Sequence, residues 1–418
     1  MQRRDIMALG AAALAASALG RPLPAQAASP SQGRLGQMIS AGDFGVVGDG
    51  RADDTAALQA ALDAAYAGED GGLLVIPPGR YRVSRTLRIA PDGNVTRQSG
   101  ILGIGARIIS AIADGSNILE IESHSTFRFL LIQGLDIHGS GKDGHGIRLA
   151  CPGNRNFLYN FCLRDLVVQG CGKNGCQLIG NVFEGQLANC YFRNNRGHGV
   201  SFQHDAAGKG ILSAVRVIGG VFGENGQHGA AMLDGCYDVS YHGTYFLLNR
   251  RFGLVAENGC TLLSSCGFEN NHEGADDFSR GDAGIWLQGF GTLVGCTAYS
   301  MFRQTHLLRA TLSGRLTLVG CSGSGDAKAA GAGLAILRGD PRSSATVIGC
   351  SGVLRTEGGF EAIELGGTEA GLRCGGDWQS RALAQLGDYR LWVDRQGRLR
   401  IKKGRPQRDD DGSAVGMA

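Results

Sequence analysis

The chain has 418 residues, of which 69 are glycine and 12 are cysteine, and its formal net charge at pH 7 is +3. A charge this close to zero excludes a general electrostatic attraction to nucleic acid or to a membrane surface. The length alone suggests two or three domains, although a solenoid of repeated coils has no such size limit because each coil contacts only its neighbours.

The first 27 residues have the features of an export signal and not of a folded segment. Arg3 and Arg4 precede a weakly apolar run from residue 6 to residue 19, which is too short to span a bilayer. Ala25-Gln26-Ala27 suits a signal peptidase, so the mature chain is expected to begin near Ala28. The segment resembles a twin-arginine signal, with Sec export as the alternative, and it predicts a periplasmic or secreted protein. No other segment is expected to span a membrane.

Residues 28–41 form a polar linker in this interpretation, and residues 42–90 form a cap. Asp54 or Thr55 is placed to cap a short helix, whose apolar face is formed by Ala57, Leu58, Ala61, Leu62 and Ala65. A strand follows at residues 73–76 and ends at Pro77-Pro78-Gly79-Arg80-Tyr81. We expect this cap to cover the open end of the β-structure that follows.

The cap resembles the amino-terminal cap of the pectate lyase superfamily. The resemblance rests on the helix and on three motifs, Phe44-Gly45-Val46-Val47-Gly48-Asp49-Gly50, Asp53-Asp54-Thr55 and Ile76-Pro77-Pro78-Gly79-Arg80-Tyr81. It implies a right-handed β-helix over residues 42–372, in a group that includes polygalacturonase-like hydrolases, polysaccharide lyases and phage tailspike depolymerases. The similarity to tailspikes also implies a homotrimer.

Between residues 144 and 352 the chain repeats one structural unit. Six glycines each open a short apolar strand, with spacings of 29, 24, 30, 24 and 31 residues: Gly146, Gly175, Gly199, Gly229, Gly253 and Gly284. A second strand contains a position that is usually small or sulfur-bearing, filled by Leu166, Cys190, Gly220, Thr244, Cys266, Cys296, Cys321 and Cys350. Five residues later, four successive units have an asparagine, at Asn195, Asn225, Asn249 and Asn271.

These units predict a single-stranded, right-handed parallel β-helix of the all-β class. The short alternating segments exclude helical repeats, and spacings of 24 residues are too short for a propeller blade. Coils stacked at about 4.8 Å would place equivalent residues in ladders. We expect the small and sulfur-bearing position to form an interior ladder of packed thiols. We expect the asparagines to adopt a left-handed turn conformation and to bond to the backbone.

Residues 373–418 are expected to form a terminal hairpin and a polar tail. The two strands are predicted at residues 389–394 and 398–401, with Gly397 in the turn. This segment is similar to short carboxy-terminal tails of other β-helix proteins, and it could cap the solenoid or pair subunits.

The turn before each glycine-led strand is the main candidate site. In polygalacturonases this turn carries acids and a histidine, and the equivalent positions here are filled by His145, Asn174, His198, His228, Phe252 and Ala283. Equivalent residues of adjacent coils would lie about 5 Å apart. Because the paired carboxylates that inverting hydrolases need are missing from this turn, hydrolysis by that mechanism is not favoured.

Arginines and histidines near these turns favour an anionic polysaccharide and β-elimination. Arginine can bind a uronate carboxylate with two hydrogen bonds, and histidine can remove the adjacent proton. We expect His198 or His228 to be the base, with Glu224 orienting a histidine. The expected substrate-binding residues are Arg193, Arg196, Arg250, His145, Asp143 and Trp286, the last by stacking on a sugar ring. The alternative is a solvated edge on which charges keep the protein soluble.

No cofactor is expected apart from a calcium ion, whose candidate ligands are Asp276, Asp277 and Asp282; a solvated acidic loop is the alternative. Two other functions stay open. One is a glycoside hydrolase that uses Asp143, Asp234 or Glu257, and the other is a non-catalytic protein that adheres to glycans. The sequence therefore predicts an exported, carbohydrate-active β-helix with a polysaccharide as its partner.

Overall fold

The computed structural model describes residues 38–414 apart from internal gaps. The gaps comprise residues 68–70, 154, 206, 209, 234, 258–260, 272–282, 301–305, 326–332, 359, 361, 367–371, 375–383, 387–388, 394–395, 397, 404–407 and 409. The predicted signal at residues 1–27, most of the linker, and the calcium candidates Asp276, Asp277 and Asp282 lie outside the described residues. No helix in the described ranges is long and apolar enough to cross a membrane.

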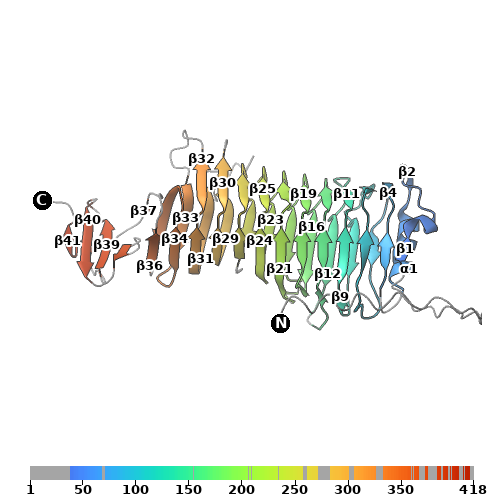
Figure 1. Ribbon diagram of the computed structural model, residues 1–418, viewed down its shortest axis with the longest axis horizontal. Coiled ribbons are helices and arrows are strands. Elements are labelled where there is room, and N and C mark those ends of the chain that lie inside the picture. The colour runs from blue at the N-terminus through green and yellow to red at the C-terminus, as the bar shows by residue number, and fades with distance from the viewer. Residues whose placement is uncertain are drawn as a thin grey trace, which may run out of the picture. The chain divides into compact units, whose positions relative to one another are not determined.

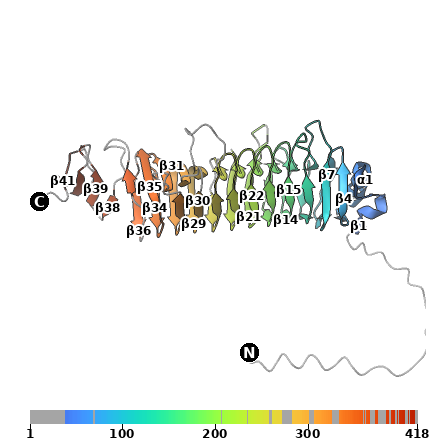
Figure 2. The same ribbon diagram turned by 90° about the horizontal axis from the view of Figure 1, so that it is seen from above.

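Parallel strands stack coil upon coil into a β-solenoid, which confirms the predicted parallel β-helix with one short helix. The strands pair in a sheet of 30 strands and in a second sheet of 11 strands. Figure 1 shows the successive coils side by side, and Figure 2 shows them from above, with α1 at the end where the amino-terminal coils lie.

The glycine-led strands form one column of the 30-stranded sheet. The column consists of β5 (Leu87–Ile89), β8 (Leu119–Glu122), β12 (Ile147–Cys151), β16 (Cys176–Gly180), β20 (Val200–Gln203), β23 (Ala230–Met232), β26 (Leu254–Ala256), the first part of β29 (Ala283–Val294) and of β31 (His306–Val319), β33 (Gly333–Gly339), β35 (Val353–Gly358) and β37 (Leu372–Cys374). The opening glycines lie where backbones of adjacent coils approach closely. A Cβ atom on Gly199 would come within 2.4 Å of the carbonyl oxygen of Gly229.

A second column belongs to the same sheet. It contains β1 (Met38–Ser40), β3 (Leu73–Val75), β6 (Ser99–Leu102), β10 (Leu130–Gln133), β14 (Cys162–Arg164), β18 (Gln186–Ala188), β21 (Leu212–Ile218), β24 (Cys236–His242), β27 (Thr261–Ser264), the later parts of β29 and β31, β34 (Ser344–Ile348) and β36 (Ala362–Gly366). Three short strands precede this column in their coils, β9 (Phe127–Arg128), β13 (Leu158–Tyr159) and β17 (Val182–Phe183).

The 11-stranded sheet is called the small sheet below. It consists of β2 (Asp49–Asp53), β4 (Gly79–Val83), β7 (Ala106–Ser110), β11 (Asp136–His138), β15 (Val167–Gln169), β19 (Tyr191–Arg193), β22 (Val221–Gly223), β25 (Tyr245–Leu247), β28 (Gly267–Glu269), β30 (Thr297–Ser300) and β32 (Ser322–Gly325). The turn after each of its strands leads into the next glycine-led strand. That turn carries the candidate site residues.

The solenoid begins earlier than the sequence predicts. β1 lies inside the predicted linker at residues 28–41 and pairs in parallel with β3. Its central residue Ile39 is buried, and the 3-10 helix η1 (Ala41–Phe44) follows directly. One buried side chain between an exposed methionine and a half-buried serine gives too weak a pattern to reveal such a short strand.

The cap helix α1 (Thr55–Ala65) buries the predicted apolar face through Leu58, Ala61, Leu62 and Ala65, whereas Ala57 is half-buried. Asp54 occupies the N-cap position without a side-chain capping bond. Its carboxylate instead accepts hydrogen bonds from the backbone N–H groups of Val47 (2.6 Å) and Gly48 (3.2 Å). The capping residue therefore fixes the glycine-rich loop before the helix.

Equivalent residues form ladders inside the solenoid. The predicted thiols at Cys190, Cys266, Cys296, Cys321 and Cys350 are all buried, and the first four form no disulfide. A second ladder consists of four buried phenylalanines, Phe192, Phe222, Phe246 and Phe268, with ring centroids 5.3, 5.4 and 4.8 Å apart. These apolar and sulfur-bearing ladders make up the core at the turn.

The asparagine ladder is buried, and its predicted backbone conformation was wrong. The left-handed conformation belongs to the preceding residues, Asn194, Glu224, Leu248 and Asn270. Each ladder side chain donates to a carbonyl of the previous coil, and the first three also donate to the Oδ1 atom of the next asparagine. The three contacts between asparagines, at Asn195, Asn225, Asn249 and Asn271, are 3.1, 2.9 and 2.8 Å long.

The carboxy-terminal strands pair antiparallel. They are β38 (Ala384–Leu386), β39 (Tyr389–Val393), β40 (Leu399–Lys403) and β41 (Ser413–Ala414). The pairing of β39 with β40 confirms the predicted hairpin, and its turn residue Gly397 lies outside the described residues.

Candidate functional site

The residues before the glycine-led strands form one continuous turn column, which we define as Asn117, His145, Asn174, His198, His228 and Phe252. The side chains of the first five members each accept a hydrogen bond from the backbone N–H of the next member. The five donor–acceptor distances are 3.0, 3.2, 2.9, 3.3 and 3.2 Å. Asparagine Oδ1 and histidine Nδ1 serve the same purpose here, so the column links successive coils.

The rings in this column stack. His198 and His228 have centroids 5.2 Å apart at an interplanar angle of 9°, so the two predicted bases lie on one side of the solenoid. Phe252 stacks on His228 at 5.7 Å, and Trp286 stacks on Phe252 at 6.1 Å. Trp286 is half-buried, so it continues the aromatic stack and presents part of its ring to solvent.

The hydrogen bonds fix which ring nitrogen carries the proton. Because Nδ1 of each histidine accepts a backbone N–H, the neutral ring holds its proton on Nε2. Burial lowers the pKa of His145 to about 4, and the charges of Lys173 and Arg148 act in the same direction. Burial and the charge of Arg251 also lower the pKa of His198 to about 4. At neutral pH these two histidines are uncharged Nε2–H donors.

Four cations lie on the same turns as the column. Lys173 and Arg251 directly precede column members, and Arg196 and Arg250 follow ladder asparagines at equivalent positions two coils apart. All four are exposed, and none forms an ion pair with another described residue. We call these four residues the cationic wall. Unpaired cations beside a row of neutral donors are suited to a polymer that carries repeated negative charges.

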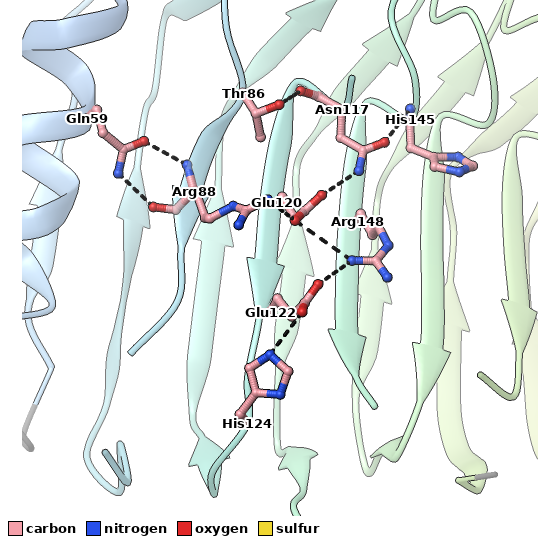
Figure 3. Close-up of polar contacts among 9 residues, drawn as sticks. All are labelled: Gln59, Thr86, Arg88, Asn117, Glu120, Glu122, His124, His145 and Arg148. Carbon is pink, nitrogen blue, oxygen red and sulfur yellow. Dashed lines mark hydrogen bonds and ion pairs between the residues drawn. The ribbon is translucent and has the colours of Figure 1, made fainter. Parts of the chain in front are cut away.

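A compact charged cluster lies on the outward face of β5, β8 and β12, at the start of this strand column (Figure 3). Arg148 Nη1 lies 2.8 Å from Glu122 Oε2 and 3.9 Å from Glu120 Oε1. Glu120 also pairs with Arg88 at 2.9 Å, and Glu122 with His124 at 3.0 Å. We define Arg88, Glu120, Glu122, His124 and Arg148 as the charged cluster. Asn117 of the turn column donates to Glu120 at 2.5 Å and joins the two arrangements.

The charged cluster is half-shielded from solvent. The side chains of Glu120, Arg148 and Glu122 have exposed fractions of 9%, 23% and 26%, whereas those of Arg88 and His124 exceed half. Burial alone would raise the pKa of Glu122, but the hydrogen bond and charge of Arg148, with His124, hold that pKa below its usual value. Glu122 is therefore ionised at neutral pH.

A cleft of about 520 Å³ borders this cluster at Arg88. It lies beside the end of α1, and its lining combines apolar and acidic side chains, including Leu62, Asp63, Tyr66, Ile89 and Asp92. Gln59 of α1 bonds to both backbone groups of Arg88, at 2.8 Å each. The cap helix thereby positions the strand that carries Arg88.

Two predicted site residues have structural roles. Asp143 is buried, and its two oxygens accept backbone N–H groups of Ser140 (2.6 Å) and Gly172 (2.7 Å). It shapes the turn before His145 and is not available to a substrate or to hydrolysis. Glu224 pairs with Arg193 at 3.6 Å and forms no hydrogen bond or ion pair with a histidine among the described residues, so its orienting role stays a prediction.

The sequence places the turn column correctly but does not single out the charged cluster, of which only Arg148 lies in a recognised repeat. β8 pairs in register with β12, so that Glu120 lies beside Arg148, yet Ile118 stands where later coils have the opening glycine. The available signal was the alternation Leu119-Glu120-Ile121-Glu122, which places both carboxylates on the outward face. Of the rival acids, Asp234 lies outside the described residues and Glu257 is half-buried after β26.

Comparison with known families supports this organisation. Residues 38–276, more than half of the chain, match the model described as rhamnogalacturonase A/epimerase, pectate lyase-like. The chain belongs to this pectate lyase-like family. The family match covers the whole turn column and the charged cluster. Residues 359–417 match a second model, described as capsule depolymerase.

Curated relatives of this pectate lyase-like chain include a mannuronan C5-epimerase, AlgE5 of Azotobacter vinelandii, which is 29% identical over 247 residues. That match spans 52% of the chain and 22% of the relative. Alginate lyase 7 of the same organism is 47% identical over 64 residues, which is 15% of the chain and 7% of the relative. The chain therefore matches less than a quarter of the length of either relative.

Among solved structures, tailspike protein 2 of the Escherichia coli O157:H7 bacteriophage CAB120 has a TM-score of 0.55 at 13% identity. The match covers 86% of this chain and 53% of the tailspike. An identity this low shows a shared fold only.

Proposed function

We propose that this protein binds an anionic uronate polysaccharide such as alginate and cleaves it by β-elimination. The observation that carries the proposal is the cationic wall beside His145 and His198, which are neutral Nε2–H donors. The kinship with a mannuronan C5-epimerase and an alginate lyase supports a uronate as the sugar. We retain export to the periplasm or medium, and the homotrimer, as predictions.

In this proposal the reacting sugar lies between Glu122 and Arg148. Arg148 neutralises its carboxylate, which makes the proton on C5 more acidic, and stabilises the negative charge that develops as the proton leaves. Lys173 and the Nε2–H group of His145 bind the carboxylate of an adjacent sugar, because Glu122 lies five strand positions beyond His145. His198 and His228 donate to neighbouring sugars, and Arg196 and Arg250 pair with their carboxylates. This assignment replaces the expected role of these histidines as bases, because their Nδ1 lone pairs are already used.

We assign the base to Glu122. When Arg148 turns to the substrate carboxylate, Glu122 loses the partner that lowers its pKa and becomes a stronger base. Removal of the C5 proton by Glu122 is followed by cleavage of the bond between C4 and the glycosidic oxygen, which leaves a double bond between C4 and C5. The leaving oxygen takes a proton from solvent.

C5 epimerisation is the second candidate, because the 29% identity to a mannuronan C5-epimerase spans 247 residues. It shares the first step, but the proton returns to the opposite face of the sugar. Hydrolysis is less well supported. Glu120 and Glu122 lie two residues apart on one strand face, roughly 6.6 Å, near the separation that glycosidases use. Hydrolysis would need one of them to hold a proton at neutral pH, whereas Glu122 is kept ionised by Arg148.

The test is incubation of the full chain with polymannuronate, polyguluronate and mixed alginate in deuterated water. Elimination produces the ultraviolet absorbance of an unsaturated sugar, and epimerisation produces deuterium at C5 without chain cleavage. New reducing ends without either signal would indicate hydrolysis and contradict the proposal. Arg148→Ala should abolish the reaction, whereas Arg107→Ala, a matched arginine that pairs with Asp136 on the small sheet, should not.

A further inference from the structure

Three tyrosines are exposed on the outward face of the small sheet, away from the turn column and the charged cluster. Tyr191 of β19, Tyr245 of β25 and Tyr299 of β30 have exposed fractions of 40%, 37% and 51%. The residues next to them in sequence, Phe192, Phe246 and Ala298, point inward and are buried. The tyrosines therefore use only the solvent face of the sheet and have no part in the core.

The tyrosines recur at every second coil. Tyr191 pairs with Val221, and Val221 pairs with Tyr245. Two further coils lead to β30, where Tyr299 lies two residues beyond the direct partner position. With coils stacked at about 4.8 Å, the Cα atoms of successive tyrosines are separated by roughly 9.6 Å along the stack. This repeat is close to the length of two pyranose rings in an extended 1,4-linked chain.

The central ring is held in place over a glycine. A Cβ atom at Gly267 would come 2.3 Å from Cδ2 of Tyr245, so that ring lies directly over the backbone of the next coil. The hydroxyl group of Tyr245 donates to Glu269, which fixes the ring from its far end. One face of the ring covers Gly267, and 37% of the residue is exposed to solvent. Such a fixed, flat ring loses little conformational entropy when a ligand packs on it.

We propose that Tyr191, Tyr245 and Tyr299 form a second polysaccharide-binding surface, which holds an extended 1,4-linked chain along the coils. The apolar faces of pyranose rings pack against the tyrosine rings, while Glu269 and the Arg193–Glu224 pair at the edge of the surface accept and donate hydrogen bonds to sugar hydroxyls. A second protein is less well suited, because a specific interface needs about 800 Å² of contact from each partner. Here single rings alternate with Val221 and Gly267.

This surface does not depend on the proposed reaction. It would bind a long polymer while a different stretch of that polymer, or another chain, occupies the turn column. Its ligand is defined by the spacing of sugar rings rather than by charge, so a neutral 1,4-linked glucan should bind as well as alginate does at this surface.

Affinity electrophoresis of the full chain in gels that contain alginate or hydroxyethyl cellulose tests the proposal. Tyr191→Ala and Tyr299→Ala should each weaken retardation by roughly two- to tenfold in both gels, as expected for loss of one ring contact. Tyr245→Phe keeps the ring and should retain most of the binding. Cleavage of short uronate oligomers, where present, should stay unchanged in all three variants.

Unchanged retardation of both alanine variants in the cellulose gel would overturn the proposal. So would a change in sedimentation coefficient without a change in retardation, because that result would identify an interface between copies of the chain. Loss of oligomer cleavage in Arg148→Ala with intact retardation would separate this surface from the reaction. A protein that binds both polymers and cleaves neither would refute the proposed function and leave the second surface standing.

Discussion

At the scale of single residues, His198 links acidity to stability. Its pKa is about 4 in the folded chain and about 6.5 in an unfolded one. The unfolded state therefore binds more protons between these values, and folding stability should fall as pH decreases from 6.5 to 4, by ~2 kcal/mol for this group.

Asn174 occupies an equivalent position and accepts the same backbone hydrogen bond through Oδ1, so His198→Asn should preserve the turn and remove this pH dependence. Urea unfolding at pH 7 and at pH 4.5 measures the difference. The control is His124→Asn, since that side chain is 68% exposed. An equal loss of stability on acidification in His198→Asn and in the unsubstituted chain would contradict the argument.

Glu122 provides the second prediction at this scale. Glu122→Gln keeps the size of the side chain and removes its capacity as a base, so kcat on alginate should fall by roughly 10²- to 10⁴-fold with little change in KM. Asp136→Asn is the matched control, because Asp136 pairs with Arg107 on the small sheet outside the charged cluster. Steady-state rates from the ultraviolet assay give kcat and KM for both variants. An equal fall in kcat in both variants would show that Glu122 is not the base.

Candidate site residues can be recognised in the sequence where they lie at a constant distance from an opening glycine. They cannot be recognised in this way in a coil that lacks that glycine. The histidines were grouped correctly for the first reason. The cluster around Glu120 escaped because Ile118 replaces the opening glycine. The role of the histidines could not be predicted from the sequence, because only the structure shows that their Nδ1 atoms accept backbone N–H groups.

At the scale of structural elements, the buried asparagine ladder stabilises the turn between the small sheet and the glycine-led column. Asn225 donates to Phe192 O (3.0 Å) and to Asn249, and accepts from both nitrogen groups of Asn195. Asn225→Ala should lower the free energy of unfolding by ~3 kcal/mol, because buried groups of two coils lose partners at once.

Asn225→Asp should be at least as destabilising, since a buried carboxylate cannot donate to Phe192 O. Asn194→Gly is the control, because glycine readily adopts the left-handed conformation of this exposed residue. Chemical denaturation monitored by circular dichroism gives the comparison. If Asn225→Ala lowered the free energy of unfolding by less than 1 kcal/mol, water would have to replace the hydrogen bonds of Asn225.

The recurrence of these asparagines was visible in the sequence, but their burial and geometry were not. A turn asparagine usually suggests a left-handed conformation on an exposed loop. The structure assigns that conformation to the residue before, and Asn249, for example, is completely buried. Side-chain contacts between coils, which no local pattern encodes, account for the difference.

At the scale of the whole molecule, the cationic wall extends over several coils and should make polymer binding sensitive to salt. Raising NaCl from 0.05 to 0.5 M should weaken alginate binding by roughly tenfold or more, because exposed charges are screened. The triple variant Lys173→Gln, Arg196→Gln and Arg250→Gln should bind weakly with a shallow salt dependence, whereas Arg107→Gln should behave like the unsubstituted chain. Isothermal titration at four salt concentrations measures the affinity for alginate. If the affinity of the triple variant fell with salt as steeply as that of the unsubstituted chain, the cationic wall would be excluded as the binding surface.

The fold as a whole was accessible from the sequence because one unit recurs at near-constant intervals, and stacking then fixes which residues become neighbours. Boundaries were less accessible. β1 lies within the predicted linker. A terminal strand of three residues is held mainly by its pairing with the next strand, β3, and its own sequence gives little signal.

The turn column has a consequence for how such proteins diversify. Histidine and asparagine are interchangeable along it, because each supplies one acceptor atom for the backbone N–H of the next coil. A functional imidazole can thus be shifted by one coil through two single exchanges, without redesign of the scaffold. Evolution, or an engineer, could in this way retune which sugar along a bound chain meets the reactive position.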